Sequence, residues 1–169
     1  MGLDIHAYSN LKPVADRNEA QFSLYCAIDH HFGNLKEGGY EGARCPHSFR
    51  RSYGGWTRVR EELAELAGWP EWSGDVPKSN DLMEDAFNQA FYKNNPRQAY
   101  AAFSDEINDW SDLPLLPLIK FSDCDGAICT DVCKAISTDL DSLKLGEDLQ
   151  ELADLFRWAA ENEGVVIFH

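Results

Sequence analysis

The stretch GEDLQELADLFRWAAENEGVVIFH, residues 146–169, contains the two kinds of secondary structure from which the fold is expected to be built. Its first part repeats apolar residues at the spacing of one helix face, namely Leu149, Leu152, Leu155, Phe156 and Ala159. Gly164 predicts where this helix ends, and the apolar run after it is typical of a short strand. A helix that leads directly into a strand indicates a domain in which helices pack on a small sheet.

Similar patterns occur in the first half of the chain. Residues 2–8, GLDIHAY, alternate in polarity as a strand does, and residues 21–32 form a second apolar segment whose type the pattern leaves open. The glycine-rich residues 33–42 are interpreted as a loop. Residues 57–68, TRVREELAELAG, predict a helix with Thr57 as its N-cap.

The second half predicts more helices between extended segments. One helix is expected after Asn80 and another from Pro96 onward. The prolines of residues 111–121 favour an extended segment, and Thr130 is expected to cap a further helix. Together these elements predict one α+β domain, residues 1–169, with a small mixed or antiparallel sheet and about four to five helices.

Length and composition narrow the class of protein. A chain of 169 residues can bury a core without disulfides or metal. No apolar stretch approaches the roughly 20 residues that a membrane span needs, and the first residues do not resemble a secretory leader. The five cysteines lack the even, dense spacing of a secreted disulfide framework. The chain is therefore expected to be a soluble cytoplasmic protein with reduced thiols and no membrane partner.

Charge is distributed unevenly along the chain. Residues 1–60 carry eight Lys or Arg and six Asp or Glu, whereas residues 61–169 carry seven and twenty-three, and the net charge is −14. Such a field opposes direct binding of nucleic acid and favours either cationic partners or solubility alone.

Residues 121–128, FSDCDGAI, have the Asp-x-Asp-Gly pattern with which haloacid-dehalogenase-type phosphatases present a nucleophilic aspartate and a second carboxylate beside Mg²⁺. Asp123 and Asp125 fit this local pattern. The rest of the chain does not, because only 44 residues follow Asp125, mostly predicted helix, where that fold needs more parallel sheet and further catalytic side chains. A structural loop that uses Gly126 is the favoured interpretation.

Metal binding is a further candidate chemistry, suggested by Cys45, His47, Cys129 and Cys133. Zinc sites usually show two close pairs such as C-x-x-C or H-x₃-H, which these residues do not form. Small core residues are the simpler interpretation of the cysteines, and the zinc alternative stays open. His6 and His169 are interpreted as a strand residue and a terminal residue. No cofactor and no catalytic residue are predicted.

The segment RCPHSFRRSYGGWTRVR, residues 44–60, holds five of the chain's eight arginines together with serines and aromatic rings. Guanidinium groups bind phosphate or carboxylate through two parallel hydrogen bonds, and aromatic faces stack on planar rings. A helix that starts near Thr57 would add free backbone N–H groups for an anion. This segment predicts a small anionic, nucleotide-like ligand, and pairing of the arginines with the surplus acidic side chains is the alternative.

In the predicted site, Arg50, Arg51 and Arg58 hold the anion, and Tyr53 or Trp56 stacks on the ligand. The full set, in which the last two residues bond a sugar or base, is Arg50, Arg51, Ser52, Tyr53, Trp56, Arg58, Ser122 and Asp123.

Four stretches together resemble an uncharacterised protein family of phages, prophages and bacteria: MGLDIHAYS, SFRRSYGGWTRVREELAELAG, LIKFSDCDGAI and EGVVIFH. Members of that family open on MGLD, carry an Arg/Ser/Tyr-Gly segment before a helix, continue to a Phe-Ser-Asp-Cys-acidic-Gly loop and finish on a short strand. The resemblance covers most of the chain in order and leaves out residues 69–110. It implies an origin and no activity, and it weighs against the phosphatase interpretation because the family's loop accepts Glu at the position of Asp125.

Three functions follow from these patterns. The leading hypothesis is a non-enzymatic phage or prophage accessory protein that binds a small anionic, nucleotide-like ligand, with countering host defence as one such role. The alternative is an acidic interaction protein that docks on a basic host or phage protein and imitates nucleic acid. Its contact would use the helical carboxylates Glu61, Glu62, Glu65, Glu147, Asp148, Glu151 and Asp154. A Mg²⁺-dependent phosphate-ester hydrolase is the third.

Overall fold

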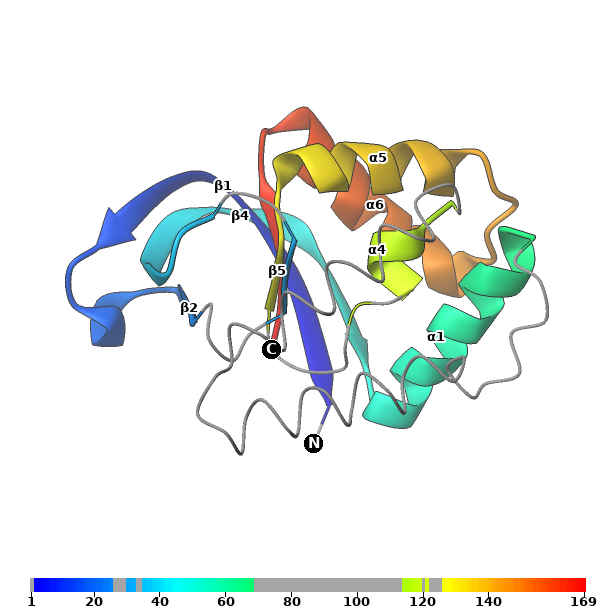
Figure 1. Cartoon of the computed structure of the whole chain (residues 1–169), viewed down its shortest axis with the longest axis horizontal. Helices are drawn as coiled ribbons and strands as arrows, with labels where there is room; N and C mark the ends of the chain where they lie inside the picture. Colours follow the sequence, from blue (N-terminus) through cyan, green and yellow to red (C-terminus); the bar gives the residue numbers. More distant parts are fainter. Residues whose placement is uncertain (1, 26–29, 33–34, 69–113, 120, 122–125) are drawn as a thin grey trace, which may run out of the picture.

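Six strands form one sheet in the computed structural model, which describes residues 2–25, 30–32, 35–68, 114–119, 121 and 126–169 (Figure 1). In sheet order they are β2 (Phe22–Leu24), β4 (Gly38–Arg51), β1 (Leu3–Val14), β6 (Val165–Phe168), β5 (Gly126–Ile128) and β3 (His30–Phe32). The first five pair antiparallel with their neighbours, and β3 pairs parallel with β5. The sheet is therefore mixed, with the long strands β1 and β4 as its framework.

The four α-helices of the described chain lie on one side of this sheet (Figure 1). They are α1 (Tyr53–Leu66), α4 (Leu116–Ile119), α5 (Thr130–Asp141) and α6 (Glu147–Glu161), and a short 3-10 turn, η1 (Arg17–Glu19), follows β1. Helices packed on a small mixed sheet confirm the predicted α+β domain.

The main core lies between the sheet and the helices. On β1 the alternation of side chains points Leu3 and Ile5 toward the helices, where both are fully buried. The residues that the helical repeat predicts for α6 are also buried: Leu149, Leu152, Leu155, Phe156 and Ala159. Trp56 of α1 is fully buried, with its ring centroid 6.5 Å from that of Phe49 and 5.6 Å from that of Phe168. This aromatic contact fastens α1 to the sheet.

A smaller apolar cluster lies on the other face of the sheet. The rings of Tyr8, Phe22 and Tyr40 form a row with centroids 5.0 and 5.6 Å apart, and the cluster includes Ile167 of β6. Strands β2, β4, β1 and β6 are consecutive in the sheet, so the cluster runs across four neighbouring strands. The register of β1 against β4 shifts twice, which is how long antiparallel strands bend.

The start of β4 departs from the sequence-based prediction. Residues 33–42 are predicted as a loop, but residues 38–42 belong to β4 and pair with β1 and β2. Gly42 is required there because a Cβ at this position would stand 2.5 Å from the backbone oxygen of Ser9. Glycine in this stretch allows close approach of two strands rather than a loop.

The predicted start of α1 is wrong by about one turn. The helix begins at Tyr53, and Ser52 is its N-cap, because the Ser52 hydroxyl oxygen accepts a hydrogen bond from the Gly55 N–H at 3.1 Å. Thr57, predicted as the cap, lies inside the helix.

Two predictions for the second half of the chain are also wrong. Thr130 is the first residue of α5 and not its cap, and its hydroxyl donates to the backbone oxygen of Gly164 at 2.8 Å. Within residues 111–121, predicted to be extended, the described part contains the short helix α4. The helices predicted after Asn80 and from Pro96 lie outside the described residues.

The end of α6 is a Schellman turn. Glu163 adopts a left-handed conformation with φ of 50°, and the Gly164 N–H donates to the backbone oxygen of Ala159 at 2.8 Å. Gly164 does follow the helix as predicted, but it is not the residue with positive φ. It is needed because a Cβ there would stand 2.6 Å from the backbone oxygen of Tyr8.

Candidate functional site

An exposed polar surface runs along β1 and β4 on the sheet face away from the helices. Because Leu3 and Ile5 point to the helices, Asp4 and His6 point the other way. The register sets Asp4 opposite Arg50 and His6 opposite Ser48. We call this surface the β1/β4 face and define it by Asp4, His6, Arg44, Ser48, Arg50 and His169.

Arg50 is the most exposed charged group of this face that forms an ion pair. Its Nε lies 3.0 Å from Oδ1 of Asp4, and the two side chains are 75% and 38% exposed. An ion pair with this exposure contributes roughly 0–1 kcal/mol. The guanidinium of Arg50 can therefore exchange Asp4 for another anion at little cost.

Arg44 contacts His6 on the same face. Nη2 of Arg44 lies 2.9 Å from Nδ1 and 3.0 Å from Nε2 of His6. A guanidinium group can only donate hydrogen bonds, so the imidazole must accept with an unprotonated nitrogen. Partial burial lowers the pKa of His6, and the charges of Arg44 and His169 lower it further, while Asp4 opposes them. The contact with Arg44 and the lowered pKa both favour the neutral form of His6.

The two arginines outnumber the one carboxylate among the side chains of the β1/β4 face, in a protein whose net charge is −14. Exposed guanidinium groups with a hydroxyl between them, as Ser48 provides, form a surface that suits phosphate or carboxylate. The chemistry that this arrangement supports is recognition of an anion.

The structure places the three arginines predicted to hold the anion on different faces of the sheet. Arg51 follows Arg50 in a strand, so its side chain points to the opposite face of the sheet. There its guanidinium lies 4.2 Å from the centroid of the Phe49 ring, and Nη2 donates to the backbone oxygen of Asp148 at 3.2 Å. Arg58 is exposed on α1, which packs on that same opposite face. Arg50, Arg51 and Arg58 therefore do not converge on one anion.

The aromatic part of the predicted site also changes. Trp56 is fully buried in the core, so its ring is not on the surface to stack on a ligand. Tyr53 is 40% exposed, and Ser52 beside it uses its hydroxyl to cap α1. Ser122 and Asp123 lie outside the described residues.

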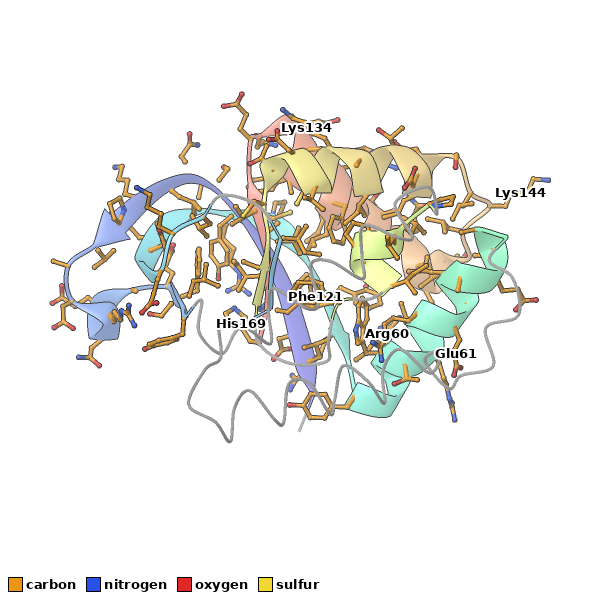
Figure 2. All side chains as sticks on the ribbon, viewed as in Figure 1. Arg60, Glu61, Phe121, Lys134, Lys144 and His169 are labelled. Atoms are coloured by element: carbon orange, nitrogen blue, oxygen red, sulfur yellow. The ribbon has the colours of Figure 1, made fainter. Side chains whose placement is uncertain are left out.

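Arg60 is partly buried and donates a hydrogen bond within the protein. Its Nη1 donates to the backbone oxygen of Phe121 at 3.2 Å, and Figure 2 shows the two residues side by side next to α1. Of the five arginines in residues 44–60, only Arg44 and Arg50 belong to the β1/β4 face.

The candidate metal ligands are dispersed. Cys45 and Cys133 are buried in the main core, and the Cys133 thiol donates to the backbone oxygen of Ile128 at 3.2 Å. Cys129 belongs to the smaller cluster on the other face. Burial raises the pKa of the Cys45 and Cys133 thiols, which favours their protonated form. Across the described ranges, no three side chains of ligand type lie close enough to hold a metal ion.

A hollow of about 410 Å³ opens elsewhere, at the start of α5. Its charged lining residues are Asp131 and Glu163, and the described lining contains no Lys, Arg or His. The two carboxylates of this hollow repel an anion. The positive charge that an anion would require is therefore on the exposed arginines and not in this hollow.

Comparisons of the chain with protein-family models, curated proteins and solved structures found no match. Within the part of the chain that the structure describes, no helix has both the length and the apolar character needed to cross a bilayer.

Proposed function

We propose that this protein binds a small anionic, nucleotide-like ligand on the β1/β4 face, without a chemical reaction, as an accessory factor of phage or prophage type. The observation that carries this proposal is the pair Arg44 and Arg50, two exposed guanidinium groups on one face of the sheet. Each is held by a side chain that an anion can replace, His6 in one case and Asp4 in the other.

Geometry supports a phosphate-sized group at this position. Ser48 and Arg50 are two residues apart on one strand face, a separation of roughly 7 Å between their Cα atoms. Long arginine side chains span such a distance easily, so one phosphate can contact Arg50 and the Ser48 hydroxyl together. Tyr53 is 40% exposed, but it begins α1, which packs on the opposite face of the sheet, so the proposed contacts are those of the arginines and Ser48 and not stacking on this ring.

Isothermal titration calorimetry with ATP, ADP and inorganic phosphate tests the proposal. The double substitution Arg44→Ala and Arg50→Ala should weaken binding at least about 100-fold, because each charge-assisted hydrogen bond contributes about 1.5–3 kcal/mol and two are lost. Arg157→Ala is the matched control, since it removes the same charge from α6, where Arg157 pairs with Asp141 and Asp154. Binding that survives the double substitution, or no binding to any of the three compounds, would overturn the proposal.

A basic protein partner is the second candidate function. Glu62 and Glu65 are exposed near the carboxyl end of α1, and no basic residue lies in its last turn. Negative charge at this end of a helix opposes the helix dipole, so these glutamates cost stability, which a cationic partner would offset. A complex of this protein with such a cationic partner should form at 50 mM salt and dissociate at 500 mM salt, because salt screens the attraction between the charges. A complex that resists salt would rule out this candidate.

A further inference from the structure

The contact between Arg44 and His6 is incompatible with the doubly protonated, positively charged form of the histidine. Nη2 of Arg44 lies within 3.0 Å of both ring nitrogens, and only an unprotonated ring nitrogen can accept its hydrogen bond, so a proton on both nitrogens would leave this donor with no acceptor in the ring. The contact thus holds only while His6 is neutral. Any ligand that draws Arg44 away removes this restriction.

The other groups around His6 come from three elements. Ser48 of β4 lies opposite it, and Asp4 lies two residues before it on β1. On the β6 side the paired residue is Ile167, which carries no charge, and the ring of His169 lies 5.9 Å away, centroid to centroid. Arg44 is the guanidinium group in direct contact with His6, and its charge lowers the pKa of the imidazole. Its movement would therefore change the electrostatic environment of the imidazole most.

We propose that His6 takes up a proton when an anion binds the β1/β4 face, so that the protein binds its ligand more tightly as the pH falls. The bound anion would draw the donors of Arg44 to itself and place negative charge beside the imidazole. Both changes favour the imidazolium form, which then donates a further hydrogen bond to the ligand. This inference rests on the proposed function, because it requires the anion to bind at Arg44 and Arg50.

The direction of the pH effect follows from linkage. In the free protein the pKa of His6 is lowered from its usual value of 6.5. In the complex it would be raised by the anion, so binding takes up protons at every pH between the two values. Affinity should then rise by up to about tenfold for each pH unit of decrease across that interval, and level off on either side.

Sulfate is the right probe for this coupling, because it keeps its charge between pH 5 and 8 while a phosphate titrates in that range. Calorimetry at pH 6.5 in two buffers of different protonation enthalpy, at matched ionic strength, measures the protons taken up per sulfate bound. Wild-type protein should take up a large fraction of one proton. His6→Gln keeps an acceptor for Arg44 but cannot be protonated, so it should bind sulfate without uptake.

His169→Gln is the matched control, since it removes the neighbouring imidazole and should retain the uptake. Sulfate binding by wild-type protein without proton uptake, or uptake that persists in His6→Gln, would overturn the coupling and leave the anion site standing. If His169→Gln abolishes the proton uptake and His6→Gln does not, the proton binds to His169, and the proposed role of His6 is overturned. Failure of both sulfate and the nucleotides to bind would overturn the proposed function itself.

Discussion

Replacing Trp56 by alanine should lower the free energy of unfolding by about 3–5 kcal/mol, the usual cost of removing a large buried aromatic side chain. The Trp56 ring is fully buried and packs edge-on against Phe49 and Phe168, so its removal leaves a cavity between α1 and the sheet. Urea denaturation followed by far-ultraviolet circular dichroism measures the change. A loss below about 1 kcal/mol would show that this ring does not fasten α1 to the sheet.

Two control substitutions separate burial from other effects. Tyr53→Ala removes an aromatic ring from the same helix at a 40% exposed position, and should change stability by no more than about 0.5 kcal/mol. Trp56→Phe keeps an aromatic ring and removes the indole N–H, whose nitrogen is buried with no acceptor among the described residues. It should therefore cost clearly less than Trp56→Ala.

Gly164→Ala should destabilise the protein by about 3 kcal/mol, at the upper end of the range for overpacked sites. The new methyl group would stand 2.6 Å from the backbone oxygen of Tyr8 and 3.3 Å from Cα of Ala159. Neither neighbour can move freely, because Tyr8 pairs with Val165 in the sheet and Ala159 lies in α6. Thermal and urea denaturation both measure this loss.

Two substitutions that introduce no steric clash serve as controls for the Gly164 result. Gly54→Ala lies in the first turn of α1 with no atom within 4 Å of the new Cβ, so it should be neutral or slightly stabilising. Glu163→Gly should stabilise by about 0.5–1 kcal/mol, because glycine adopts the left-handed conformation of this residue without strain. Equal effects of Gly164→Ala and Gly54→Ala would contradict the proposed clash.

The elements that the sequence predicts well are those whose pattern is local. The apolar repeat of α6 and the alternation at the start of β1 each report the buried face directly. The amino-terminal part of β4 gives no such signal, because residues 38–44 contain three glycines and few apolar side chains. Its strand state depends on pairing with β1, which lies more than twenty residues earlier in the chain.

The candidate site is predicted only in part, for a related reason. Sequence adjacency groups Arg50 with Arg51, whereas the alternation of a strand separates them onto two faces. Knowing that residues 44–51 form a strand would have been enough to find this division. The contact of Arg44 with His6 joins residues 38 positions apart, and it depends on the irregular register between β1 and β4. No local pattern contains that information.

The pairing of β1 with β6 has a consequence for how the chain is made. These two strands are neighbours inside the sheet, although β1 is synthesised first and β6 about 150 residues later. On the ribosome, β1 can pair with β4 early, but its other edge keeps unpaired backbone groups until residues 165–168 emerge. That edge is open to pairing with strands of other chains throughout synthesis. The sheet can therefore close only after residues 165–168 have been made, and a chain that stops before β6 would expose the middle of its own core.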